Sequence, residues 1–383
     1  MNSQNFGYGR TADGNTPALM LPNPMATNIT MNSISIKTAI VILNWNGEHF
    51  LRQFLPNVLQ HSLCDDVAVV VADNGSTDGS LALLDTQFPE VQQIRLDQNY
   101  GFAEGYNRAL SQINATYYVL LNSDVEVAPN WLQPLTTFMD SHPKVAACAP
   151  KIIAHTNRQQ FEYAGAAGGF IDRWGYPFCR GRILSNIEPD NRQYDTPLQT
   201  FWASGAALFI RAKAYAEAGG LDARFFAHME EIDLCWRLNN HGYQVWNIPQ
   251  STVYHVGGGT LPNNNPRKLY LNYRNSLYML HKNLNTSALW PILLFRMCLD
   301  GLSGLAYLFS GNPQNTAAVI RSHVDFWRNI GASQHFRTNT PKRPRRQIST
   351  IYHRSILIDF FLLKHRTFNG LKWKNDRKQY SDR

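Results

Sequence analysis

Between residues 38 and 127 the sequence alternates apolar, β-branched runs with amphipathic runs, and this alternation limits the possible folds strongly. Apolar runs at 38–47, 65–80 and 116–127 each lead into Asn, Asp, Gly or Ser, which is typical of buried strands that enter loops. Segments with helical spacing separate them, at 49–61, 80–88 and 101–113. We therefore expect an α/β fold with a mixed, mainly parallel sheet flanked by crossover helices.

Polar side chains follow three of these strands. They are the groups Asn44–Asn46, Asp73–Asp78 and Asn122–Asp124. In wound α/β sheets, ligands bind beyond the carboxyl ends of the strands, so we expect the three groups to meet at one edge of the sheet. This edge is the first candidate site.

The carboxylates of this edge suggest particular ligands. Asp73 directly ends a buried strand, where a carboxylate needs a donor such as a nucleobase N–H or a ribose hydroxyl. Asp124, with Asn122 two residues earlier on the same face, could hold Mg²⁺ or Mn²⁺ if substrate phosphates complete the coordination shell. The structural alternatives are a turn at Asp124 and helix capping at Asp78.

A second acidic stretch, FFAHMEEIDLCWRL at 225–238, contains three carboxylates in apolar surroundings. If a helix begins near Met229, then Asp233 can pair with Arg237 four residues later. Glu230 has a place in the first turn, where the helix dipole favours the ionised form. Glu231 has no local cation, so it is a candidate general base.

His255 follows another strand-like run and precedes three glycines, in YHVGGGT. A single histidine is usually structural. Here the glycines leave the backbone bare, which suits the close approach of a phosphate group.

Cysteine content and charge limit the class of protein. The 5 cysteines form no CxxC motif or Cys/His cluster, so a reduced, cytoplasmic protein without structural zinc is expected. Residues 1–36 lack the pattern of a secretory signal, and we interpret them as a flexible leader. From residue 334 onward there are 13 Lys and Arg against 3 Asp and Glu, so the net charge of +8 comes from this segment.

In combination, these motifs resemble family 2 glycosyltransferases of the GT-A fold, in the rhamnosyltransferase-like branch. VILNWNG, VVVADNGSTDGS, NYGFAEGYNRAL, LLNSDVEV, ASGAALFIR and GGLDARFFAHMEEIDLCWRL occur in the family's order between about 38 and 282. The resemblance implies a Rossmann-like GT-A domain at 37–282, with a nucleotide-binding half at 37–127 and an acceptor half at 128–282. It also implies an inverting, metal-dependent transfer of a sugar from a dTDP- or UDP-sugar donor, with rhamnose as a candidate, to a cell-surface glycan or lipid-linked acceptor.

The resemblance assigns roles to individual residues. Asp124 and His255 would bind Mg²⁺ or Mn²⁺. Glu231 would be the general base, although the family usually has Asp at this position, and Glu230 is the alternative. The donor pocket would contain Asn46, Asp73, Asn74, Gly105, Asn107, Asn122, Ser123, Ser204 and Gly205.

The C-terminal part predicts a membrane partner. Residues 283–333 form an apolar to amphipathic helical region, in which 288–310 is long enough to span a bilayer but contains Arg296 and Asp300 on one helical face. We favour an interfacial or core-packed helix there. The basic segment 334–383 mixes aromatic residues with Lys and Arg, which favours an anionic membrane surface over nucleic acid. A peripheral position at the inner face of the cytoplasmic membrane follows, and a solvated segment with a short packed helix is the alternative.

Two other functions remain open at this level. A sugar-1-phosphate nucleotidyltransferase would also bind a nucleotide on an α/β sheet, but no Gly-rich loop bearing Arg or Lys follows the first strand. A non-catalytic nucleotide-sugar binding module is the second alternative, because Asn122 and Glu231 replace two aspartates of the family pattern.

Overall fold

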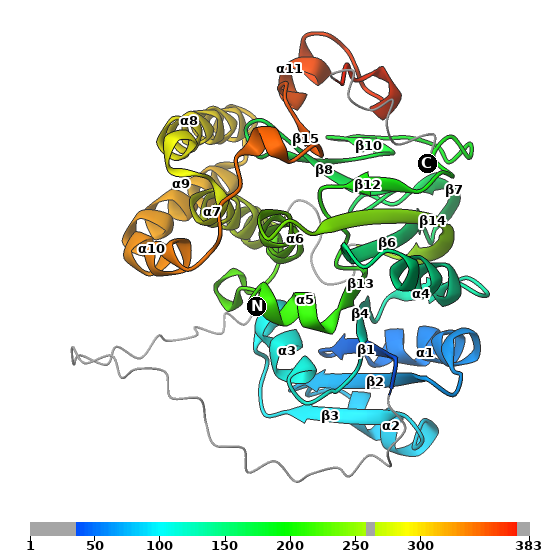
Figure 1. Cartoon of the computed structure of the whole chain (residues 1–383). Helices are drawn as coiled ribbons and strands as arrows, with labels where there is room; N and C mark the ends of the chain where they lie inside the picture. The colour runs from blue at the N-terminus through cyan, green and yellow to red at the C-terminus, as the bar shows by residue number, and fades with distance from the viewer. Residues whose placement is uncertain (1–35, 258–264, 374–383) are drawn as a thin grey trace, which may run out of the picture. The chain divides into compact units, whose positions relative to one another are not determined.

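The computed structural model describes residues 36–257 and 265–373 (Figure 1). The predicted leader lies outside these residues except for Ile36. All five cysteines are free.

The expected parallel sheet is confirmed. β1 pairs in parallel with both β2 and β4, and β2 pairs in parallel with β3. These strands are β1 (Thr38–Asn44), β2 (Val67–Asn74), β3 (Gln92–Leu96) and β4 (Tyr117–Asn122). The helices α1 (Glu48–Ser62), α2 (Ser80–Gln87) and α3 (Gly101–Leu110) connect them. Side chains alternate between the two faces of β1, where Ile40 and Ile42 pack on one side and Val41 on the other, so both faces are buried.

The sheet continues beyond β4 through strands that come later in the chain. Its order is β12-β14-β6-β13-β4-β1-β2-β3, with β5 on β14 and β7 on β6. β13 pairs antiparallel with β4, so the sheet is mixed, as expected. The bounds are β5 (Val125–Val127), β6 (Val145–Ala154), β7 (Asn157–Phe161), β12 (Leu198–Thr200), β13 (Ala207–Arg211) and β14 (Gln244–His255), with the helices α4 (Leu132–Ser141), α5 (Ala212–Glu217) and α6 (Glu230–Asn240).

The segment predicted as a basic tail contributes to a second sheet. β15 (Ile351–Tyr352) pairs in parallel with β8 (Gly169–Asp172), in the order β11-β10-β9-β8-β15. The other strands are β9 (Pro177–Cys179), β10 (Arg182–Ile183) and β11 (Asn186–Ile187), and α11 (Ile356–Phe361) follows β15. Because Ile351, Ile356 and Phe368 are buried, this segment is packed on the body as far as it is described.

The C-terminal helices pack side by side (Figure 1). They are α7 (Pro266–Asn283), α8 (Thr286–Phe309), α9 (Pro313–Arg328) and α10 (Ile330–Thr338). Among the described residues, α8 alone is long and apolar enough to cross a membrane, and 28% of its most apolar window is buried. Arg296 Nε contacts Asp300 Oδ1 at 3.0 Å, and both side chains are buried. The charged face of α8 therefore packs against protein, while residues such as Leu302 and Phe309 are exposed.

A buried charge network joins α6 to α7. The predicted pair of Asp233 and Arg237 is confirmed, with Oδ2 and Nη2 2.9 Å apart. The same oxygen lies 2.6 Å from Lys282 Nζ, and Asn283 donates to the other oxygen at 2.7 Å. Buried charges are tolerated when they are paired and hydrogen-bonded, so this network fixes α6 on α7.

The loop before α6 is strained and is held by α7. Phe226, His228 and Met229 have φ angles of 63°, 72° and 73°, a region that non-glycine residues rarely adopt. The Asn275 amide nitrogen on α7 lies 2.9 Å and 2.8 Å from the carbonyl oxygens of Ala227 and His228. These contacts compensate for the strain and set the position at which α6 begins.

Replacement of Asn275 by Ala should therefore be strongly destabilising. It removes the donor that serves buried carbonyl groups, and we expect a loss of about 2–4 kcal/mol in the free energy of unfolding. Urea denaturation followed by circular dichroism measures this loss. Gln314→Ala, an exposed change on α9, is the matched control. A loss for Asn275→Ala that equals the control value would contradict the role of this clamp.

Candidate active site

Two polar residues lie at the carboxyl ends of adjacent parallel strands. Asn44 on β1 is the register partner of Asp73 on β2, and its amide donates to Asp73 Oδ1 at 3.1 Å. The other Asp73 oxygen accepts from the Ser76 backbone N–H at 2.9 Å. Asp73 is almost fully buried, and these two donors satisfy part of the hydrogen-bonding capacity of its carboxylate. Each carboxylate oxygen can accept a further bond, so a ligand remains compatible with this geometry.

The next strand along the edge brings Asp124 and His255 into contact. Asn122 is the last residue of β4, and Asp124 lies between β4 and β5. β5 pairs with the end of β14, which places His255 Nε2 3.2 Å from Asp124 Oδ1 and 3.4 Å from the Asn122 amide nitrogen. Topology therefore assembles a carboxylate, an amide and an imidazole from segments 131 residues apart in sequence.

Glu162 completes this group, and the sequence analysis missed it. It follows β7 directly, is buried, and places Oε1 3.6 Å from His255 Nδ1. Its other oxygen accepts from the Ala164 N–H at 2.6 Å. The available indication was a carboxylate that ends a strand and precedes the small residues AGAAGG.

The two carboxylates determine the protonation of His255. Although burial opposes the charged form, the nearby carboxylates of Asp124 and Glu162 raise the pKa of His255 to about 10. For Asp124, burial acts in the upward direction, but the hydrogen bond and charge of His255 lower its pKa overall. Asp124 is therefore ionised at neutral pH.

Glu231 reaches the same edge from α6. The backbone N–H of Asn122 donates to Ala206 O at 3.0 Å, which places the turn 204–206 beside the end of β4. A Cβ on Gly205 would lie 3.7 Å from Glu231 Cβ, so Glu231 packs directly against this turn. A short series of contacts thus connects Asn122 to the candidate base.

The surroundings of the two adjacent glutamates differ from those of ordinary first-turn carboxylates. Oε2 of Glu230 and Oε2 of Glu231 are both enclosed and have no hydrogen-bond partner among residues 36–257 and 265–373. Burial raises the pKa of Glu231 to about 7. Burial and the charge of Glu231 raise the pKa of Glu230 well above its usual value. Both carboxyl groups therefore hold their protons to a higher pH than ordinary glutamates do.

Several predicted donor-binding residues have structural partners. Asn74 Nδ2 donates to Gly101 O at 3.0 Å and its Oδ1 accepts from Tyr100 N, which fixes the start of α3. Asn107 Oδ1 accepts from Tyr215 OH and its Nδ2 donates to Leu221 O.

The remaining predicted residues lie as follows. Asn46, with φ 51°, accepts from the Thr77 N–H at 2.7 Å and so joins the loops after β1 and β2. Gly105 packs against Leu43 and Asn74, where a Cβ would lie 3.0 Å from each, and Ser204 donates to Ala164 O. Ser123 is near Gly47 in the loop after β1. Asp78 accepts from the Glu48 and Ser80 backbone N–H groups, which matches the capping alternative.

The donor chemistry of the edge fits a divalent cation. Among the described residues, no group of three or more His, Cys, Asp or Glu side chains is arranged to hold a metal. With a pKa of about 10, His255 carries a proton at neutral pH, which a metal ion would have to displace. Asp124 and the neutral ring would then supply two ligand types that Mg²⁺ and Mn²⁺ accept, with Asn122 beside them. Glu162 lies against the far nitrogen of the ring, where an outer carboxylate orients a ligating histidine. Substrate oxygens would have to complete such a site.

Comparison with known proteins supports this assignment of fold and activity class. The family model described as glycosyl transferase family 2 matches residues 39–214. An N-acetylglucosaminyl-diphospho-decaprenol L-rhamnosyltransferase of Mycobacterium tuberculosis is 26% identical over 240 residues, which are 56% of this chain and 75% of that protein. The O-antigen biosynthesis protein RfbC of Myxococcus xanthus is 25% identical over 227 residues, but the match covers only 17% of its length.

A solved structure shares the fold. The crystal structure of GalNAc-T7 with UDP, GalNAc and Mn²⁺ superposes with a TM-score of 0.51 at 15% identity. The superposition covers 67% of this chain and 49% of that one. The predicted GT-A fold is confirmed, the chain is a glycosyltransferase, and its residues 39–214 match the model of glycosyl transferase family 2.

Proposed function

We propose that this glycosyltransferase moves a sugar from a nucleotide-sugar donor to an acceptor hydroxyl with inversion at the anomeric carbon. The observation that carries the proposal is the enclosed Glu231 Oε2, which has no partner in the described part of the chain and lies on the same sheet edge as Asp124 and His255. Glu231 takes the proton of the acceptor hydroxyl as its oxygen forms a bond to the anomeric carbon. The bond from that carbon to the nucleoside diphosphate breaks on the opposite face.

The two ends of the site would bind different parts of the donor. Asp73 and Asn44 lie where the base and ribose of the donor would bind. Asp124 and His255 would hold Mg²⁺ or Mn²⁺, which when bound stabilises negative charge on the departing diphosphate. The GalNAc-T7 structure, which shares the fold, contains UDP and Mn²⁺, and this supports the choice of ligand class.

The relatives suggest the substrates. The mycobacterial relative is named for rhamnose transfer to a diphospho-decaprenol acceptor, and the Myxococcus relative for O-antigen biosynthesis. We extend rhamnose, a dTDP- or UDP-linked donor and a lipid-linked glycan acceptor to this chain. The role would then lie in cell-envelope polysaccharide synthesis on the cytoplasmic side of the membrane.

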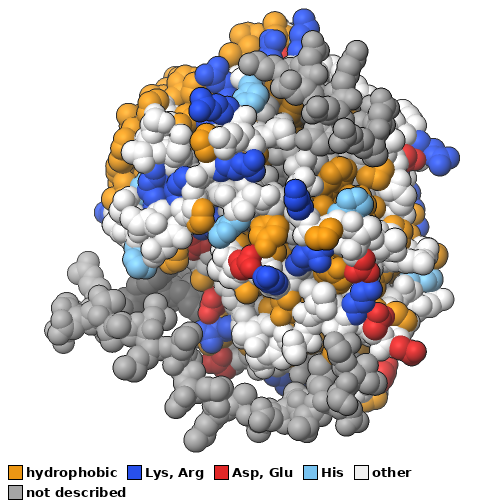
Figure 2. Space-filling model, viewed as in Figure 1, with side chains coloured by type: hydrophobic (Ala, Val, Ile, Leu, Met, Phe, Trp, Pro, Cys, Tyr) orange, Lys and Arg blue, Asp and Glu red, His pale blue; other side chains and the backbone are white. Residues whose placement is uncertain are grey.

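An exposed apolar surface on α8 and α9 is the proposed contact with the membrane. The ridge, defined here as Leu294, Leu302, Leu305 and Phe309 of α8 with Ile320 and Trp327 of α9, is exposed. Figure 2 shows hydrophobic side chains gathered at the edge that α8 and α9 occupy in Figure 1. Exposed Arg321 lies on the same pair of helices. A ridge of this composition fits the headgroup region of an anionic bilayer.

Glu231→Gln should separate chemistry from binding. The amide keeps the shape but cannot take the proton, so we expect turnover to fall by about 10²–10⁴-fold while the dissociation constant for the donor changes little. Steady-state kinetics and calorimetry measure these quantities. Glu230→Gln is the matched control and should keep most of the activity. Equal losses in both variants would contradict the assignment of the base.

The pH dependence provides an independent check. A protonated carboxyl cannot accept the acceptor's proton, and the pKa of Glu231 is raised to about 7. We therefore expect kcat/KM to fall as the pH drops below about 7, with a tenfold loss per unit at low pH. A profile that stays level down to about pH 5, near the ordinary glutamate value, would disagree with this environment.

Asp124→Ala should weaken nucleotide binding only when metal is present. Calorimetry with UDP or dTDP should show a loss in affinity of at least about tenfold in Mn²⁺ and little change in EDTA. Asp85→Ala, on the exposed face of α2, is the control. Unchanged affinity in Mn²⁺ would exclude Asp124 as a metal ligand.

Charges placed on the ridge should release the protein from lipid. Leu305→Glu with Phe309→Glu should reduce co-sedimentation with phosphatidylglycerol vesicles at least about tenfold. Leu63→Glu, at an equally exposed leucine after α1, should bind like the wild type. Equal binding by the ridge variant and the wild type would remove α8 from the contact.

A further inference from the structure

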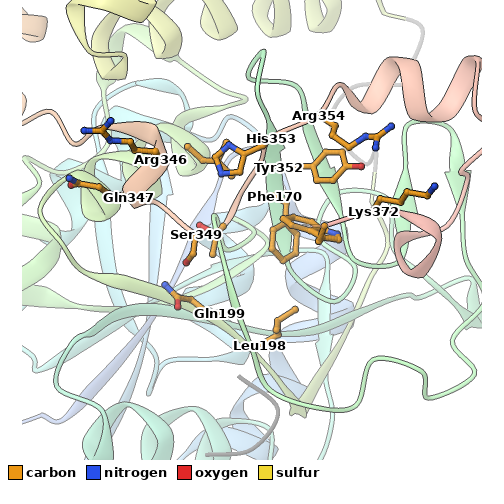
Figure 3. A pocket seen from close by; sticks show the side chains of 13 residues that line it. Phe170, Leu198, Gln199, Arg346, Gln347, Ser349, Tyr352, His353, Arg354 and Lys372 are labelled. Atoms are coloured by element: carbon orange, nitrogen blue, oxygen red, sulfur yellow. The ribbon is translucent and has the colours of Figure 1, made fainter. Parts of the chain in front are cut away.

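A cavity beside the five-stranded sheet shares no lining residue with the catalytic edge. Its volume is about 490 Å³, within the usual range of small-ligand sites. The walls come from β8, β12, the segment from Arg346 to Arg354 that includes β15, and Lys372 near the end of the described chain (Figure 3). Residues that are far apart in sequence thus line the same cavity.

The cavity is lined by basic groups and by no acidic ones. Arg346, His353, Arg354 and Lys372 are among the lining residues, which include neither Asp nor Glu. Figure 3 shows Arg346 on one side and Arg354 and Lys372 on the other. Within residues 36–257 and 265–373, Arg346 and Lys372 form no ion pair, and Arg354 makes only a long contact of 3.6 Å with Asp359. The positive charges of Arg346 and Lys372 are therefore unpaired within the described ranges.

A buried hydroxyl in the lining has no partner. Thr350 is 4% exposed, lines the cavity, and its Oγ1 forms no hydrogen bond within the described part of the chain. A buried polar atom without a partner is destabilising, so a ligand oxygen that accepts from this hydroxyl would be favoured. This observation is independent of the basic rim and points to the same kind of ligand.

Aromatic rings form the remaining wall. Phe170 and Tyr352 lie in the middle of the cavity view, between the basic side chains (Figure 3). The Tyr352 hydroxyl already donates to Asp359 Oδ2 at 3.0 Å. The ring rather than the hydroxyl is therefore available to contact a ligand. The Phe170 carbonyl accepts from Trp202 Nε1, and Trp202 precedes Ser204 of the catalytic edge by two residues.

We propose that this cavity binds a phosphate group carried by a sugar or a lipid headgroup. The phosphate oxygens would accept from the guanidinium and ammonium groups of the rim and from the Thr350 hydroxyl. The carbon-rich face of the attached group would lie against Phe170 and Tyr352. The site is separate from the donor site and does not require the proposed catalytic roles.

The test compares two sites on the same protein. Binding of glucose 1-phosphate is measured by calorimetry in Mn²⁺, where a ligand held at the donor site would depend on Asp124, with wild type, Arg346→Ala combined with Thr350→Val, and Asp124→Ala. We expect the double variant to lose affinity at least about tenfold, and Asp124→Ala to bind like the wild type. Arg192→Ala, at an 87% exposed arginine outside the cavity, is the charge control.

A second arm distinguishes the source of the phosphate. Vesicles of phosphatidylglycerol are compared with vesicles of phosphatidylcholine for the same variants. Loss of binding to glucose 1-phosphate by the double variant supports a glycan phosphate, and loss confined to phosphatidylglycerol vesicles supports a lipid headgroup. The proposal is overturned if the double variant matches the wild type in both arms, or if Asp124→Ala alone loses binding. An unchanged thermal unfolding midpoint confirms that the double variant is folded.

Discussion

The ion network at the α6–α7 contact is the constraint on which the candidate site depends. Asp233 is fully buried and is paired with Arg237 and Lys282, so α6 has a fixed place against α7. The same helix begins with Glu230 and Glu231, whose enclosed oxygens have no partner among the described residues. Because the charge of Asp233 is compensated and that of Glu231 is not, one helix carries both a structural carboxylate and a candidate catalytic one.

The order of the strands explains how the site forms from distant segments. The parallel strands β2, β1 and β4 bring Asp73, Asn44 and Asn122 to one edge, and β5 pairs with β14 to add His255. The parallel strands β1, β2 and β4 are buried on both faces, so their ends are positioned by packing as well as by hydrogen bonds. The polar groups therefore occupy fixed positions at the edge of a rigid sheet, which is the arrangement that ligand binding requires.

Local sequence patterns predicted the parts of the structure that depend on neighbouring residues. The parallel strands follow from apolar runs that alternate with helical segments, and the pairs Asp233–Arg237 and Arg296–Asp300 follow from the helical spacing of four residues. Contacts between distant segments could not be predicted in this way. Glu162 reaches His255 across the sheet, and the segment around Ile351 adds a strand to β8. Asn107, which the family resemblance assigns to the donor pocket, bonds to Tyr215 on α5 and to Leu221 in the loop that follows, and both partners are distant in sequence.

The central claim is that the edge formed by β2, β1, β4 and β14 holds a metal-bound nucleoside diphosphate beside Glu231. The most direct test is the anomalous scattering of Mn²⁺ in crystals grown with UDP or dTDP. The account predicts one manganese peak within coordination distance of both Asp124 and His255, with the diphosphate density on the side that faces Glu231. A manganese peak bound by other residues, or a nucleotide away from Asp73 and Glu231, would contradict it.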